Sequence, residues 1–262
     1  MNARRSIEST LMFSSLRPLV RYVDAELAVL EVHAGLRWFP SEPRAMGRWA
    51  GQPVSLRVEV DDESGFHDEM VAEVDLARGC AVARMDFVQP EAWWPAGMGE
   101  QALHRLTVTL ARGEETLDRR QMHVGLSTVR SPGGDVIGQP YDLVVNGRPC
   151  PIEHVIPVDE RDERTFLPVR GHSVLLVRGH YGPDVLYDAA DRAGVLLLQC
   201  VPLDARGEPE CEMPRQISRL AAHPSLVGWF VGHLGDLSER IAEQLAVLDP
   251  SRGVYRTVHG LS

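Results

Sequence analysis

The stretch Pro183-Asp-Val-Leu-Tyr-Asp-Ala-Ala-Asp-Arg-Ala-Gly-Val-Leu-Leu-Leu-Gln-Cys-Val201 places a helix signal directly before a strand signal. The first part predicts a helix over 183–193, with proline near its start and Gly194 at the expected C-terminal stop. Val195–Val201 is almost wholly apolar, as parallel strands covered on both faces tend to be. The stretch therefore predicts one unit of a parallel β/α fold.

The same alternation continues on both sides of this unit. Apolar runs predict strands over 174–177, 226–231 and 254–258, and helices are expected over 213–222 and 238–248. The last helix carries an apolar face, and Asp236 with Glu239 predicts a capping box at its start. Strict alternation of strands and helices favours parallel β/α units after Asn146.

The earlier part of the chain has a different pattern. Short Val- and Leu-rich runs, several alternating in polarity and separated by turn residues, predict antiparallel strands of a sandwich of about 100 residues. A turn-rich passage, Ser131–Gly134, marks the boundary between the two patterns. We therefore expect an N-terminal extension over 1–15, a sandwich over 16–130 and a β/α domain over 131–262. The predicted strands of the sandwich cover 27–32, 54–60, 70–74, 81–87, 103–110 and 120–124.

Composition excludes several classes of protein. A net charge of −10 and scattered arginines disfavour a nucleic-acid partner. No segment approaches the roughly 20 apolar residues of a membrane span, and no signal peptide is seen, so the expected compartment is the cytoplasm. The four cysteines lack the CxxC spacing of zinc sites, and no phosphate loop, HExxH helix or nucleophile elbow occurs. We expect no metal and no cofactor.

Several passages, in order, resemble glycoside hydrolase family 2, the group of β-galactosidases, β-glucuronidases and β-mannosidases. The passages are similar to the family's motifs in its immunoglobulin-like domain, at the entry to its barrel and in its second and fourth β/α units. They are Trp93–Leu103, Val124–Val129 (with Leu126 where the family has Arg), Leu143–Pro149, Val177–Tyr181, Leu186–Gly194, His223–Leu234 and Leu248–Arg252. The resemblance covers residues 90–262 and implies an immunoglobulin-like β-sandwich followed by a partial, or half, TIM (β/α) barrel.

The resemblance also locates a catalytic position. In the family the fourth strand ends in Gly-Asn-Glu, and the glutamate is the acid/base. The matching positions here are Gly232, His233 and Leu234. Because leucine can neither donate nor accept a proton, the acid/base site is expected to be degenerate.

A second carboxylate is also expected to be missing. Retaining glycosidases need two carboxyl groups about 5 to 5.5 Å apart, and the family's nucleophile comes from a later strand. Only 116 residues follow Asn146, whereas a complete barrel takes about 250. At most four or five of the eight units are expected, without the nucleophile and without the family's N-terminal sugar-binding domain.

Four residues are the candidates for ligand binding: Arg178, His180, Asp204 and His233. Arg178 and His180 fall at the C-terminal end of a predicted strand, the face where barrel enzymes bind ligands. The alternative for this pair is a salt bridge to Asp204 or Asp188. His233 could serve as a substitute acid, or it could be a strand-end residue bonded to a neighbouring loop.

Three functions remain open at this point. The first is an inactive, glycosidase-like protein with an interaction or carbohydrate-binding role. The second is an active β-glycosidase with reassigned acids, drawn from Asp204, Asp236 and Glu212. The third is a purely structural or assembly protein. In each case the open strand edges of a half barrel predict a homodimer.

Overall fold

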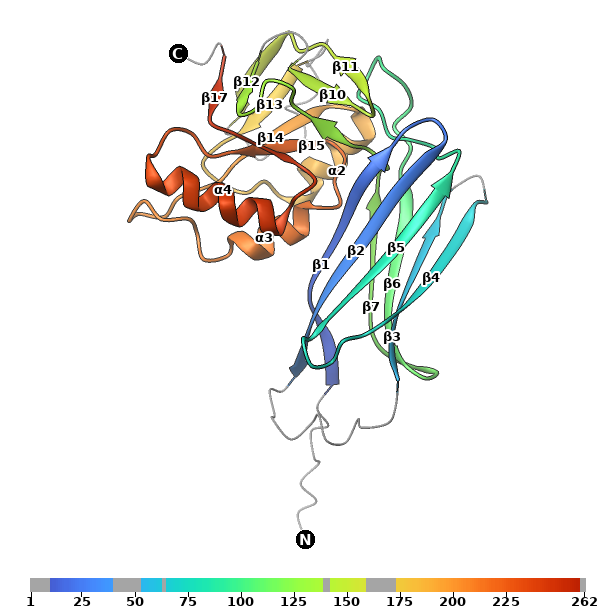
Figure 1. The fold of residues 1–262 in the computed structure, drawn as a ribbon. Coiled ribbons are helices and arrows are strands. Elements are labelled where there is room, and N and C mark those ends of the chain that lie inside the picture. The colour runs from blue at the N-terminus through green and yellow to red at the C-terminus, as the bar shows by residue number, and fades with distance from the viewer. Residues whose placement is uncertain (1–9, 40–52, 63–64, 139–141, 159–172, 260–262) are drawn as a thin grey trace. The chain divides into compact units, whose positions relative to one another are not determined.

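The computed structural model describes residues 10–39, 53–62, 65–138, 142–158 and 173–259. The described residues form two compact units, one drawn from 10–17, 31–85 and 105–122 and the other from 18–30, 86–104 and 123–259. Figure 1 shows the order of the elements along the chain.

Two sheets account for the N-terminal strands, and they confirm the expected β-sandwich. One sheet has the order β1-β2-β5 and the other β4-β3-β6-β7, in which β3 pairs antiparallel with both β4 and β6. Alternate residues of β3 and β5 are buried, as a strand with one face on a core requires. The bounds are β1 Thr10–Val23, β2 Leu27–Phe39, β3 Val54–Asp61, β4 His67–Glu73, β5 Cys80–Val88, β6 His104–Arg112 and β7 Glu115–Val124.

Two of these strands differ from the expectation of short strands. β1 has 14 residues and β2 has 13, and no strand was expected over the β1 segment. Pro18 interrupts the strand signal of β1, because proline lacks the N–H that a central strand donates. β1 lies at the edge of its sheet, where a proline is tolerated.

A short hairpin precedes the β/α region. β10 (Leu143–Val145) pairs antiparallel with β11 (Arg148–Cys150). The two connecting residues, Asn146 and Gly147, have φ of 46° and 77°. Positive φ at both central residues is the requirement of a type I′ turn, for which Asn-Gly is the preferred pair. β10 also pairs with β8 (Val129–Arg130).

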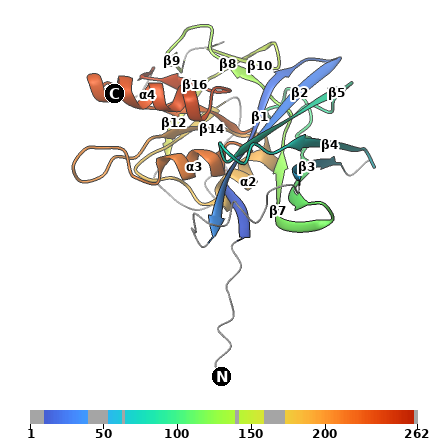
Figure 2. The ribbon, with the colours of Figure 1, turned by 60° about the horizontal axis from the view of Figure 1, so that its bottom comes forward.

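Five strands then form one parallel sheet in the order β12-β13-β14-β15-β16. Figures 1 and 2 show helices α3 and α4 side by side against this sheet. The strands are β12 His154–Val158, β13 Ser173–Val177, β14 Leu196–Cys200, β15 Leu226–Phe230 and β16 Gly253–Tyr255; the helices are α2 Asp184–Ala193, α3 Met213–Leu220 and α4 Asp236–Leu248. Two further short strands, β9 (Val136–Ile137) and β17 (Thr257–Val258), pair with each other.

Both faces of the parallel sheet are covered, which explains its nearly continuous apolar strands. One face packs against the helices and carries Leu175, Leu197 and Trp229. The opposite face carries Val174 and Leu198 and packs against side chains of the preceding segments, which include Trp93, Leu143 and Ile152. The strands expected over 174–177, 195–201 and 226–231 are confirmed to within one residue at each end. The single strand expected over 254–258 is wrong: β16 and β17 are separate strands that pair with different neighbours.

The end of α2 follows its sequence signal, whereas the start of α4 does not. Gly194 caps α2 with φ 69° and donates its N–H to the carbonyl of Ala190, as expected. The capping box predicted for α4 is wrong. That helix starts at Asp236 itself, its N-cap is Gly235, and no side chain caps it. Asp236 and Glu239 instead place negative charge in the first turn, where it favours the helix dipole.

Among the described helices, none has the length and apolarity that a transmembrane span requires.

Candidate functional site

The candidate residues lie after neighbouring parallel strands, so their positions share the carboxyl-terminal edge of one sheet. Arg178 and His180 follow β13, Asp204 follows β14, and His233 with Leu234 follows β15. These strands are adjacent in the sheet order. Asp204 and His233 nevertheless hydrogen-bond to their own surroundings: Asp204 to Arg206 and Glu208, and His233 to Thr257.

The loop after β15 is an internally bonded turn. Gly232 has a φ of 65°, and its carbonyl accepts a hydrogen bond from the Ser238 hydroxyl at 2.8 Å. The same hydroxyl oxygen accepts the N–H of Leu234 at 2.8 Å. The side chain of Leu234 is 44% exposed. This turn therefore presents an aliphatic side chain to solvent and supplies no proton donor at position 234.

His233 is exposed, and its Nε2 lies 2.8 Å from Oγ1 of Thr257. Thr257 belongs to β17, which follows β16. The contact is the neighbouring-loop bond that was one of the two alternatives for His233. A hydroxyl partner does not orient an imidazole for proton transfer in the way that a buried carboxylate does.

The side chain of Asp204 hydrogen-bonds within its own loop. Its Oδ1 accepts the backbone N–H groups of Arg206 at 2.8 Å and Glu208 at 3.0 Å, and its own N–H bonds the carbonyl of Glu208. Such side-chain bonds to following N–H groups are the usual role of aspartate in turns. Asp204 therefore shapes the loop after β14.

A more enclosed set of groups lies at the ends of β13 and β14. Nε2 of His180 and the hydroxyl of Tyr181 are buried atoms without a hydrogen-bond partner in the part of the chain that the structure describes. Burial raises the pKa of the Tyr181 hydroxyl far above its usual value, and the nearby charge of Glu210 adds to this shift. Burial also raises the pKa of the Cys200 thiol, while Arg178 opposes that rise. Nε2 of His180 and the Tyr181 hydroxyl therefore have hydrogen-bonding capacity that the described residues do not use.

Gln199 holds the backbone of this region in place. Its Nε2 donates to the carbonyl of His180 at 2.9 Å, and its Oε1 accepts from the Tyr187 hydroxyl of α2. Gln199 is fully buried, so these bonds form away from solvent. Gln199 lies within the strand expected over 195–201, where the sequence gives no signal of this role.

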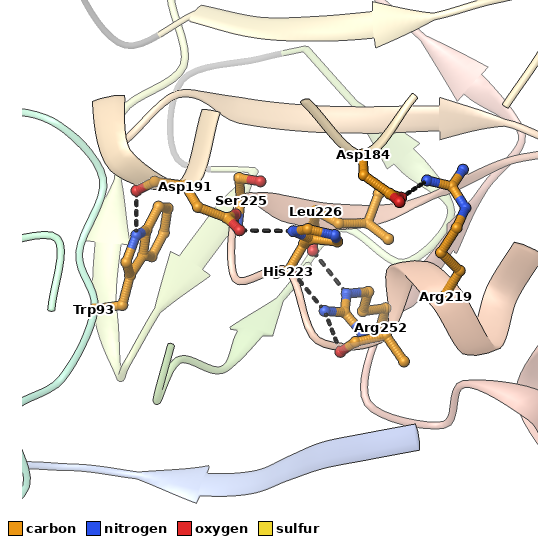
Figure 3. A network of polar contacts seen from close by, with 9 residues as sticks. Trp93, Asp184, Asp191, Arg219, His223, Ser225, Leu226 and Arg252 are labelled. Atoms are coloured by element: carbon orange, nitrogen blue, oxygen red, sulfur yellow. Dashed lines mark hydrogen bonds and ion pairs between the residues drawn. The ribbon is translucent and has the colours of Figure 1, made fainter. Parts of the chain in front are cut away.

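The opposite edge of the sheet holds a buried polar network, shown in Figure 3. Oδ2 of Asp191 lies 2.6 Å from Nδ1 of His223, and Oδ1 accepts the N–H of Ser225 at 3.1 Å. The carbonyl of Asp191 accepts the indole N–H of Trp93 at 2.8 Å. These residues precede β14 and β15, whose starts lie at the amino-terminal edge. The network therefore lies away from the strand ends that bind ligands in barrels.

Arg252 completes this edge just before β16 (Figure 3). Its guanidinium donates to the carbonyls of Leu226 at 2.7 Å, His223 at 2.8 Å and Ala221 at 3.1 Å. The same group pairs with the buried carboxylate of Asp249 at 3.0 Å. Arg252 thus joins the starts of two strands through charged hydrogen bonds.

Asp188, Asp191 and His223 carry metal-ligand atoms within 4.8 Å of one another. Both oxygens of Asp191 already accept hydrogen bonds from within the protein. The bonding is therefore that of a satisfied structural network, in which Asp191 and His223 stabilise the start of β15.

The motifs behind the family resemblance meet mainly in this network. Trp93, Asp191, Gly194, His223 and Arg252 all lie in quoted passages, and Ala96 donates its N–H to the carbonyl of Gly194 at 2.9 Å. The sequence shows their order along the chain but not the hydrogen bonds that connect them. The sequence did offer one signal of this network: Gly194, His223 and Arg252 stand just before successive predicted strands.

Comparison with known proteins identifies the same family. The family model for glycosyl hydrolases family 2 matches residues 50–126. A β-mannosidase B of Neosartorya fischeri is 28% identical over 193 residues, which are 63% of this chain and 23% of the mannosidase. An exo-β-D-glucosaminidase of Amycolatopsis orientalis is 28% identical over 55% of this chain and 17% of that protein. The chain therefore spans about a fifth of the length of these relatives.

Solved structures share the fold over nearly the whole chain. A glycosyl hydrolase family 2 member from Bacteroides cellulosilyticus has a TM-score of 0.70 at 16% identity, and the match covers 96% of this chain and 37% of that one. The exo-chitosanase of Amycolatopsis orientalis has a TM-score of 0.67 at 20% identity, with 97% of this chain and 32% of that chain covered. The family-model match and the similarity to these relatives support a relationship of this chain to glycoside hydrolase family 2, and the solved structures show that the fold is shared.

Proposed function

We propose that this chain does not hydrolyse glycosides through the family's acid/base position and that it binds carbohydrate at the carboxyl-terminal edge of its parallel sheet. The observation that carries the first half is Leu234. It stands where the resemblance places the acid/base glutamate, and its loop is bonded through Ser238 rather than through a catalytic carboxylate.

The parallel sheet is, on this proposal, part of a TIM barrel. Its five strands follow one another in chain order, and helices α2, α3 and α4 lie between the later ones. Sequential parallel strands with intervening helices are the barrel's repeating unit. The proposed domains are a sandwich over 16–130 and a partial barrel over 131–262.

The proposed ligand site consists of Arg178, His180 and His233, with Tyr181 as an additional member. Arg178 supplies an exposed guanidinium, and His180 and Tyr181 supply polar atoms without partners among the described residues. Asp204, the fourth candidate, contributes by shaping the adjoining loop. Sugar hydroxyls bond to such mixed donors and acceptors.

Calorimetric titration of the full chain with β-mannosides, β-glucosaminides, β-galactosides and β-glucuronides tests the binding half. We expect one of these sugars to bind and the Arg178→Ala and His233→Ala variants to weaken it. Arg192→Ala is the matched control, because Arg192 is an exposed arginine in the last turn of α2. Absence of binding by every sugar at millimolar concentration would refute the proposed site.

Incubation with aryl glycosides tests whether the chain hydrolyses glycosides. Turnover that falls when Asp204, Asp236 or Glu212 is replaced would instead support an active enzyme with reassigned acids. Asp204 bonds within its own turn and Asp236 begins a helix, which argues against that alternative. If neither a sugar nor a glycoside has an effect, a structural or assembly role becomes the better proposal.

A homodimer remains part of the proposal. β12 and β16 are the outer strands of the five-stranded sheet, and outer strands present unpaired backbone groups unless they are covered. Light scattering at micromolar concentration should give the mass of two chains. A stable monomer would contradict pairing through these strands.

A further inference from the structure

The sandwich carries a second cluster of chemically active side chains, remote in sequence from the candidate ligand site and from the network around Asp191. On one face of the β3–β4 pair lie Glu59, His67 and Glu69, each offering a ligand atom within 4.8 Å of the other two. Glu59 and Glu69 are direct partners across the ladder, and His67 is the partner of Asp61. Strand pairing therefore holds four polar side chains in one block on the outer face.

Two carboxylates directly opposite each other repel, so this register is unfavourable unless a cation lies between them. Arg57 lies 3.3 Å from Oε1 of Glu69, which leaves the second oxygen of that carboxylate able to accept. For Glu59, no hydrogen bond or ion pair occurs within the described residues. The half-buried carboxylate of Glu59 thus faces another carboxylate across the ladder.

Asp61 orients the imidazole. Its Oδ1 lies 2.7 Å from Nδ1 of His67, and its Oδ2 lies 3.4 Å from Nε of Arg105. With Nδ1–H donated to Asp61, the lone pair of His67 is on Nε2. A carboxylate behind a histidine is the usual support of a metal-bound imidazole, because it sets the tautomer and raises the basicity of the ligand nitrogen.

From this arrangement we infer that Glu59, His67 and Glu69 bind a divalent transition-metal ion of the zinc type, with Asp61 as the supporting carboxylate. One imidazole and two carboxylates are a ligand set that Zn²⁺ accepts, and water would complete four-coordination. Zinc bonds of about 2.0–2.2 Å require these atoms to approach more closely than 4.8 Å. Side chains on an exposed face can make that adjustment without moving the strands. The inference does not depend on the proposed carbohydrate site.

Calorimetric titration of the chelator-treated full chain with ZnCl₂ tests this inference, with MgCl₂ as the comparison ion. We expect zinc to bind at one site per chain and to raise the melting temperature, and magnesium to have no such effect. His67→Gln and Glu59→Gln should each abolish this binding event. Asp61→Asn should weaken it about 10- to 100-fold, as loss of a supporting group does.

Glu73→Gln is the matched control. Glu73 is an exposed glutamate of β4, the strand that carries His67 and Glu69, and the change removes one negative charge, as Glu59→Gln does. It should leave zinc affinity unchanged. Circular dichroism and the melting temperature in the absence of metal establish that each variant is folded. Zinc binding that persists unchanged in His67→Gln, or its absence from the parent chain, would overturn the assignment.

Discussion

Replacement of Asp191 by alanine tests whether the network in Figure 3 holds the parallel sheet together. The Asp191 side chain is 4% exposed and pairs with His223 at 2.6 Å. Its second oxygen accepts the N–H of Ser225 at 3.1 Å. Removing the carboxylate leaves an imidazole N–H and a backbone N–H buried without their acceptor.

The magnitude follows from these two bonds. A hydrogen bond to a charged group contributes about 1.5–3 kcal/mol, and two such bonds are lost. Breaking one side of a buried pair costs about 3–5 kcal/mol in other proteins, which agrees with that sum. We therefore expect Asp191→Ala to lower the free energy of unfolding by about 3–5 kcal/mol.

Urea unfolding followed by circular dichroism measures this change as a shift of the midpoint. Asp184→Ala is the control on the same helix. Asp184 pairs with Arg219, but its side chain is 66% exposed, so its loss should cost less than about 1 kcal/mol. Equal effects of the two substitutions would refute the claim that the buried network stabilises the sheet. In Asp191→Asn one side-chain acceptor remains, so an intermediate loss is expected.

Three further predictions concern single positions. Gly194→Ala should destabilise the protein by more than about 1 kcal/mol in the same urea assay, because the residue has φ 69° and an added Cβ would lie 2.5 Å from the backbone N of Ala96; an unchanged midpoint would contradict this contact. Burial raises the pKa of the Cys150 thiol to about 11, so at pH 8 only about 0.1% is thiolate, and Ellman's reagent should modify exposed Cys211 first and Cys150 only after unfolding. Leu234→Glu should yield no aryl glycosidase activity, because a side chain at this 44% exposed position lacks the desolvation that raises the pKa of a general acid; measurable turnover would show that more of the catalytic site remains.

Periodicity alone was sufficient to predict most of the β/α region. The apolar run of β14 is buried on both faces, and Gly194 ends α2, as the sequence indicated. Such local signals are reliable because burial and helix termination impose residue types directly. β12 was missed, because its five residues contain a proline and are only partly buried at the edge of the sheet.

The start of α4 shows where local rules fail. Asp236 and Glu239 have the spacing of a capping box, yet Gly235 takes the N-cap position with φ 61°. The hydroxyl of Ser238 bonds to Gly232 and Leu234 instead, and this loop geometry depends on the strand that precedes it. The spacing of residues in a capping pattern does not predict that Ser238 bonds to Gly232 and Leu234.

The sequence by itself determined the order of most strands and helices and the family resemblance, because each of these depends on residue type at a known position. Only the tertiary structure decided which side chains meet. Asp191, in the last turn of α2, and His223, just before β15, are 32 positions apart, yet the parallel β/α arrangement brings them to one edge of the sheet. Glu59 faces Glu69 because the β3–β4 register pairs them. Both contacts depend on strand pairing, which a pattern of residue types along one chain does not specify.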